Sequence, residues 1–134
     1  MSDYKIAAGH NNAAGLTALH LLLPGAFGDY AAGVLTEWHD YEDRIRSGDG
    51  HYKPIGKPWA AWVFFRLTRA ELLHLRATFC PTGEDALVTI RTLNKRADAF
   101  QNFNARLIWP DVSGLWQRDE WRDVRFEFRE LAGI

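Results

Sequence analysis

Histidine and carboxylate side chains are the first candidates for chemistry in this sequence. Of the five histidines, only His39 has several acidic residues close by, with Glu37 and Asp40 near it and Asp43 four positions on. A His and an Asp four residues apart on a helix share a face and can both ligate a metal ion. Solvated helix faces carry the same spacing, and no second histidine joins this group. We therefore predict no metal site here and no cofactor.

The single cysteine is the next candidate, as a nucleophile. A Cys–His pair needs the two side chains in contact, but His74 precedes Cys80 by six residues on a predicted helix and therefore points to another face. The loop at residues 48–51, with the sequence GDGH, has too few oxygen ligands for calcium. The common phosphate-binding, hydrolase and zinc-protease motifs are absent. We predict a buried structural cysteine and no enzymatic activity.

Tryptophans gather between positions 109 and 121, in an apparent loop. Indole rings can stack on the faces of sugar rings, anchor one subunit on the next, or fold back to cover a sheet. The sequence leaves these three interpretations open. Arginines nearby can pair with acidic residues of a neighbouring subunit. The interface candidates are Trp109, Trp116, Trp121, Arg106, Arg118 and Arg122.

The composition is that of a folded domain without a strong charge. The chain has 134 residues, of which 47% are hydrophobic and 25% are charged, as in globular proteins. This length supports one core, so we predict a single domain over residues 1–134. The net charge of −1 provides no field that would attract nucleic acid or an anionic membrane. The sequence shows neither a secretory signal nor an apolar run of about 20 residues, so we expect folding in the cytoplasm.

The first half of the chain contains the elements that must position these side chains. Two short strands are predicted over residues 4–8 and 16–23. A helix is predicted over residues 30–47, because apolar and aromatic residues recur there at intervals of three and four. That face consists of Tyr30, Val34, Trp38, Tyr41 and Ile45. A loop follows at residues 48–58, and the apolar run at 59–67 predicts a central strand covered on both sides.

The second half of the chain predicts a helix and further strands. Thr68 and Glu71 match a capping box, so a second helix should begin there and end before Pro81. Its apolar stripe consists of Leu72, Leu75 and Phe79. Residues 86–92 and 99–109 predict a hairpin, with Asn102, Asn104 and Arg106 facing away from the apolar side.

The last predicted strand shows the clearest alternation. Three apolar residues there alternate with charged ones, which is the pattern of a half-buried strand. The apolar residues are Val124, Phe126 and Phe128, and the charged ones are Arg125, Glu127 and Arg129. Together the predicted elements indicate an α+β fold, an antiparallel β-sandwich or small barrel flanked by two helices.

The layout of residues 38–131 resembles small structural proteins of tailed bacteriophages and prophages, chiefly those of tail tube and baseplate modules. The resemblance is carried by WAAWVFFRLT at 59–68, VTIRT at 88–92, FNARLIWP at 103–110 and DVRFEFREL at 123–131. Such proteins form a β-sandwich or barrel flanked by a helix and assemble into rings, often six-fold, without an active site. The resemblance therefore implies a virion protein, assembled in the host cytoplasm.

The resemblance also implies partners. These are copies of the chain in a ring and other tail proteins, with no membrane and no sequence-specific nucleic acid. The residues alone leave an alternative, a monomeric module that binds a peptide or a glycan through surface aromatic side chains.

Overall fold

The chain folds mainly as antiparallel β-sheet. The computed structural model describes residues 4–18, 34–110, 116–117 and 120–134. The strands of its main sheet are β1 (Lys5–Ala8), β2 (Thr17–Ala18), β3 (Val34–His39), β6 (Trp59–Thr68), β7 (Asp85–Asn94), β8 (Ala99–Ile108), β9 (Trp116–Gln117) and β10 (Glu120–Gly133). Their order is β2-β1-β7-β8-β10-β6-β3, and β9 pairs with β10 off this path. Two further strands, β4 (Asp43–Arg46) and β5 (Tyr52–Ile55), form a separate hairpin.

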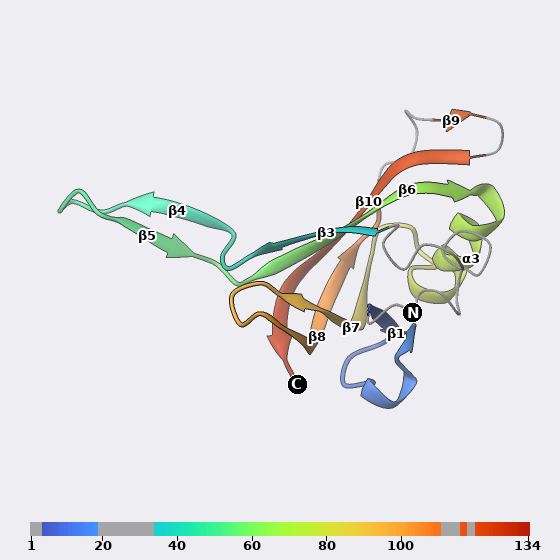
Figure 1. The fold of residues 1–134 in the computed structure, drawn as a ribbon, viewed down its shortest axis with the longest axis horizontal. Coiled ribbons are helices and arrows are strands. Elements are labelled where there is room, and N and C mark those ends of the chain that lie inside the picture. Colours follow the sequence, from blue (N-terminus) through green and yellow to red (C-terminus); the bar gives the residue numbers. More distant parts are fainter. Residues whose placement is uncertain (1–3, 19–33, 111–115, 118–119) are drawn as a thin grey trace.

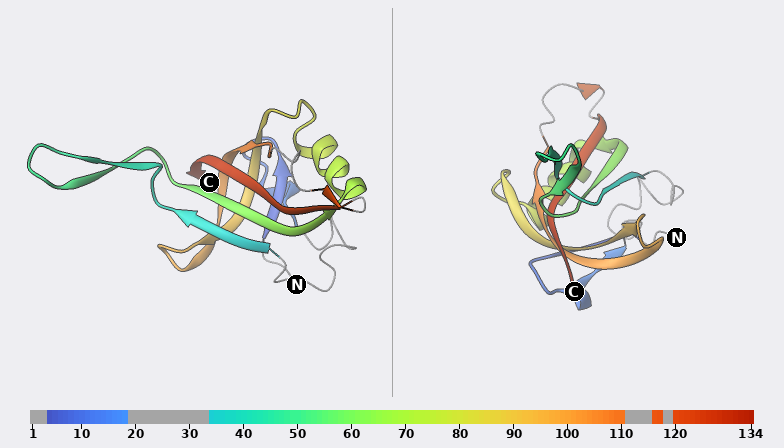
Figure 2. Two further views of the ribbon diagram at one scale, coloured as in Figure 1. Left: turned by 90° about the horizontal axis from the view of Figure 1, so that it is seen from above. Right: turned by 90° about the vertical axis from the view of Figure 1, so that its left-hand side faces the viewer.

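The sheet is strongly twisted and curved, and the helix α3 (Arg69–Phe79) lies at one end of the molecule (Figures 1 and 2). The β4–β5 hairpin extends away from the opposite end (Figure 1). A short 3-10 helix, η1 (Ala13–Gly15), joins β1 to β2. Two contacts of Thr36 link β3, at one edge of the sheet, to Tyr4 just before β1 and to Lys95 in the loop between β7 and β8. The Tyr4 hydroxyl lies 3.0 Å from the Thr36 hydroxyl, and Lys95 Nζ donates to the Thr36 carbonyl at 3.2 Å.

The apolar run at 59–67 forms a central strand, as predicted, because β6 pairs with β10 on one side and β3 on the other. Successive side chains of a strand point to opposite faces. Ala60, Trp62 and Phe64 therefore enter the core together, where all three are buried. The outer face is also covered at Ala61, which is fully buried.

The alternation in β10 is confirmed, because Val124, Phe126 and Phe128 are buried in the core. The register shifts between Arg129 and Ala132, where Glu130 has a φ of 57°. A bulge of this kind adds one residue to one strand. As a result Leu131, three positions after Phe128, is buried again.

The second predicted helix is also confirmed. It begins after Thr68, as the capping box indicates, and its buried residues are Leu72, Leu75 and Phe79. The Cys80 backbone N–H closes its last turn by donating to the Arg76 carbonyl at 2.9 Å. Cys80 itself is fully buried, as predicted.

The predicted hairpin at 86–92 and 99–109 corresponds to β7 and β8, which pair along their whole length. Phe103, Ala105 and Leu107 are buried, while Asn102 and Arg106 on the other face are partly exposed. The predicted strand at 4–8 is β1. Of the strand predicted at 16–23, β2 covers the first part, and residues 19–23 lie outside the described residues.

The helix predicted over residues 30–47 is wrong. Its described part forms β3 and β4 instead, and the loop predicted at 48–58 contains β5. A spacing of four is also an even number, so Val34 and Trp38 can share one face of a strand as well as of a helix. Pairing of β3 with β6, from Val34↔Phe64 to His39↔Trp59, overrides the local preference. Ile45, assigned to the same helix face, is half exposed on the hairpin.

This correction changes the predicted architecture. Among the described residues one α-helix, α3, accompanies the sheet, and the second flanking helix is not present there. The coarser prediction of a mainly antiparallel sheet with helical cover holds.

The packing of Phe126 provides a test of this fold. Its ring is 4% exposed and meets Phe64 and Trp109 edge to face, at centroid distances of 5.1 and 5.3 Å. We expect Phe126→Ala to lower the free energy of unfolding by about 3–5 kcal/mol in chemical denaturation, because it leaves a cavity in the core. The half-exposed Leu87 provides the control, since Leu87→Ala should cost less than about 1 kcal/mol. Equal costs for the two variants would contradict the assigned faces.

Candidate functional site

Residues 40–58, which we call the arm, leave the sheet between β3 and β6 and return to it. The arm contains the β4–β5 hairpin, whose strands pair from Asp43↔Ile55 to Arg46↔Tyr52. Its tip is a glycine-containing turn in which the Ser47 N–H donates to the His51 carbonyl at 2.8 Å. All residues of both strands are exposed. The arm is therefore built without a core of its own.

Large apolar side chains on the arm face solvent. Ile45, Tyr52 and Ile55 are 51%, 66% and 40% exposed. Residues opposite each other in a ladder share a face, so Ile45 and Ile55 lie diagonally on one face and Tyr52 lies on the other. A lone two-stranded hairpin is marginally stable in water. These side chains gain burial only if something else packs against the arm.

The arm is attached to the sheet through a stack of side chains around Trp59. The His39 imidazole lies parallel to the Trp59 indole, with ring centroids 4.1 Å apart and an interplanar angle of 8°. The Cζ of Arg129 lies 3.8 Å from the centroid of the same indole. Because β3 and β10 flank β6, His39 and Arg129 approach Trp59 from opposite sides. This stack holds the two points where the arm begins and ends.

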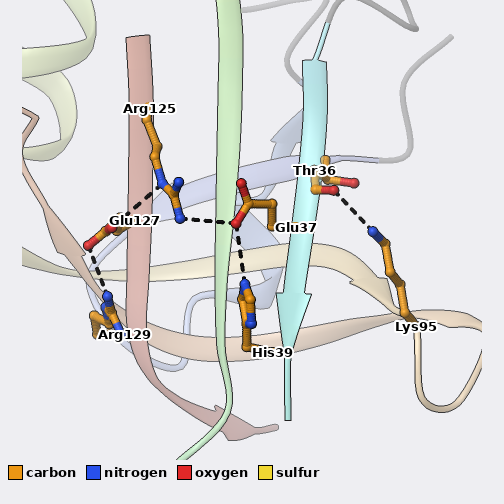
Figure 3. Close-up of polar contacts among 7 residues, drawn as sticks. All are labelled: Thr36, Glu37, His39, Lys95, Arg125, Glu127 and Arg129. Atoms are coloured by element: carbon orange, nitrogen blue, oxygen red, sulfur yellow. Dashed lines mark hydrogen bonds and ion pairs between the residues drawn. The ribbon is translucent and has the colours of Figure 1, made fainter. Parts of the chain in front are cut away.

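Charged side chains continue this attachment across the outer face of the sheet (Figure 3). Glu37 accepts from Arg125 Nη2 at 3.0 Å and lies 3.3 Å from His39 Nε2. Glu127 accepts from Arg129 Nη2 at 3.2 Å. These groups are partly exposed, so each pair contributes roughly 1 kcal/mol or less. Their stems cover the outer face of β6, which explains the complete burial of Ala61 between Glu37 and Glu127 in the register.

A hollow of about 470 Å³ lies where the arm joins the body. It is lined by residues 38–44 and combines aromatic rings with carboxylates: Trp38, His39, Asp40, Tyr41, Glu42, Asp43 and Arg44. Trp38 Nε1 donates to Asp40 at 2.8 Å, and Arg44 both donates to the Tyr41 hydroxyl and lies over its ring. Where the chain leaves β5 to return to β6, it requires a glycine at position 56. Gly56 has a φ of 84°, which disfavours other residues, and a Cβ there would lie only 2.7 Å from the Glu42 Cβ.

The structure places two of the six predicted interface residues. Trp109 is partly buried against the core and meets Phe126 edge to face, which is the arrangement of the capping interpretation. Arg106 already pairs within the chain, at 3.0 Å from Asp85 and 3.2 Å from Glu130. Hydrogen bonds to Glu130 and then to Asp85 raise the pKa of Arg106 above its ordinary value. Neither residue lies on the arm.

Of the other four predicted interface residues, the structure gives the backbone positions of three. Trp116 in β9 and Trp121 in β10 are opposite each other in the backbone register. Arg122 lies on β10 and pairs in register with Arg66, while Arg118 lies outside the described residues. Strand β9 and the end of β10 that pairs with it lie near the helix, away from the arm (Figure 1).

The residues considered for chemistry are not brought together. His39 lies on a strand with its ring stacked on Trp59, and Asp43 is on the arm. His74 is exposed while Cys80 is buried. Across the described residues, no three His, Cys, Asp or Glu side chains are grouped to hold a metal ion. Asp49 in the GDGH turn accepts from the Ser47 hydroxyl and the His51 N–H, and these bonds lower the pKa of Asp49.

Comparisons with protein-family models, with curated proteins and with solved structures found no match. In the part of the chain that the structure describes, no helix has the length and apolar character needed to cross a membrane.

The arm is the feature that sequence reasoning missed. A signal for it was present in the short runs DRIR and YKPI on either side of a glycine-containing turn. Neither run has an apolar face, so no periodicity marks it as a strand. The helix predicted over residues 30–47 places this turn in the loop that follows it.

Hydrogen exchange should separate the arm from the body. In dilute protein we expect backbone amides of β4 and β5 to open with a free energy of about 0–1 kcal/mol, because no buried side chains protect them. Amides in the centre of β8 should instead approach the free energy of global unfolding. Arm amides as well protected as those of β8 at every protein concentration would contradict an arm without a core.

Proposed function

We propose that this protein is a non-enzymatic structural subunit that assembles with copies of itself. The observation that carries the proposal is the arm, a projecting hairpin whose apolar side chains are exposed at Ile45, Tyr52 and Ile55. Covering the exposed part of each side chain contributes on the order of 1 kcal/mol. Contact with a neighbouring subunit therefore stabilises both the arm and the assembly.

The resemblance of the sequence to small phage tail proteins supports a context for this assembly. In that context the subunits form a ring in the tail of a phage or prophage, the protein belongs to the virion, and other tail proteins stack on the ring. A projecting arm and a curved sheet are compatible with such a ring, in which each subunit meets its neighbours through different surfaces. Electron microscopy of the purified protein tests this directly. Closed rings support both self-assembly and the ring, filaments support self-assembly alone, and single chains oppose both.

Removal of the arm should separate folding from assembly. Since His39 and Trp59 are opposite each other in the register, an Asn-Gly turn can join them in place of residues 40–58. We expect this variant to remain folded, with a free energy of unfolding within about 2 kcal/mol of the wild type, because a shorter connection costs less closure entropy. Sedimentation analysis should show assembly for the wild type and single chains for the variant.

A double substitution on the arm, compared with a control substitution on the body, tests the same contact without removing the arm. Ile45→Ser together with Ile55→Ser removes the apolar pair on one arm face, while Leu87→Ser changes a similarly exposed residue on the body. We expect weaker self-association only for the arm variant. A wild type that stays a single chain at every concentration would refute the proposal and favour the monomeric peptide- or glycan-binding alternative.

The tryptophans of β9 and β10 are proposed as a second contact. Trp116→Ala or Trp121→Ala should leave a folded subunit that associates more weakly by about 2 kcal/mol, roughly thirtyfold, as for other aromatic interface anchors. Light scattering over a concentration series measures this. If both variants unfold while association of the wild type is absent, these indoles belong to the core.

A further inference from the structure

Charges on the arm are separated along its length. The root of the arm, residues 40–43 and 56–58, carries three carboxylates, Asp40, Glu42 and Asp43, against one lysine. The distal part, residues 44–55, carries Arg44, Arg46 and Lys53 against Asp49. All of these residues are exposed. The arm as a whole is nearly neutral, but its two parts have opposite charge.

The carboxylates of the root are not paired with the cations farther along the arm. Among the described residues, no ion pair joins Asp40, Glu42 or Asp43 to Arg46 or Lys53. Asp49, the one carboxylate of the distal part, is already engaged by Ser47 and the His51 N–H. Since β4 and β5 are extended and paired, the distal part cannot fold back onto its own root.

The root also provides the shape for a partner. Its three carboxylates line the hollow of about 470 Å³, next to the rings of Trp38 and Tyr41. Arg44 also lines the hollow and lies over the Tyr41 ring, so the cations available to a second copy are Arg46 and Lys53. Carboxylates and aromatic faces together favour cationic side chains. Arg46 and Lys53 carry such groups on long stems, and they lie on opposite faces of the hairpin.

We propose that the hollow at the arm root binds the basic distal part of the arm of a second copy of this chain. The inference rests on the proposed self-assembly and names the surfaces that meet. One chain contributes an acidic hollow and a basic arm, so each copy can give one contact and receive one. Successive copies related by the same rotation then form a closed ring or a filament.

Charge reversal tests the pairing. One variant combines Arg46→Glu with Lys53→Glu, and a second combines Glu42→Lys with Asp43→Lys, which leaves Asp40 and its bond to Trp38 in place. Each variant alone presents like charges at the contact, so we expect its association to weaken at least about tenfold in sedimentation. Mixed in equal amounts, the two variants again have opposite charges at every contact, and association should return.

The control for the first variant is Arg69→Glu with Arg96→Glu, which makes the same change of net charge as Arg46→Glu with Lys53→Glu at exposed positions outside the arm. It should associate as the wild type does. Association of the wild type should also weaken as salt rises from about 0.05 to 0.5 M, because salt screens exposed charges. This measurement needs no variant to fold.

The outcomes distinguish the two proposals. A wild type that never associates overturns both. A wild type that associates regardless of salt, with reversed variants that behave as the control does, overturns only the arm-to-root contact. Failure of the mixture to associate, when each folded variant alone is weakened, also overturns that contact and leaves self-assembly standing.

Discussion

Trp62 connects the two halves of the sheet across the interior. It lies on β6 and is 1% exposed. Its indole N–H donates at 3.1 Å to the Thr92 hydroxyl on β7, although β10 and β8 lie between β6 and β7 in the sheet. The same ring packs against Phe128 and Tyr4. Because a buried donor and a buried hydroxyl must be satisfied, the sheet has to curve until they meet. The core and the contact of β3 with the start of the chain depend on this curvature.

The curvature also determines how the outer face of β6 is covered. No described element packs over this face, and the side chains of β3 and β10 cover it instead. Stacking of His39 and Arg129 on Trp59, together with the Glu37–Arg125 pair, brings apolar stems over the strand and keeps charges at the surface. The same contacts hold both ends of the arm, so the projection of the arm is a property of the body.

The molecule divides into a body with a well-packed core and an arm with none. Such a division suits the proposed self-assembling subunit, since the free energy of association then includes the stabilisation of the exposed hairpin by its neighbour. The body folds through its own buried aromatic side chains. The arm contributes exposed isoleucines and separated charges, which favour contact with a partner while the net charge stays close to zero.

The amino-acid sequence predicts α3, the β7–β8 hairpin and β10, because the spacing of their apolar residues indicates which side meets the core. It also predicts β6, whose continuous apolar run indicates a strand covered on both faces but not which face meets the core. Residues 34–46 were misassigned because Val34 and Trp38 fit a helix and a strand equally well, and only pairing with β6 distinguishes the two. The arm has no buried face, so its sequence shows no periodic spacing of apolar residues that would predict its strands. The stack on Trp59 arises only in the tertiary structure, which brings His39 and Arg129 from distant parts of the chain to the same indole. The charges of the arm and the residues that line the hollow are neighbours in the sequence, but only the pairing of β4 with β5 shapes them into a projecting hairpin with a hollow at its root.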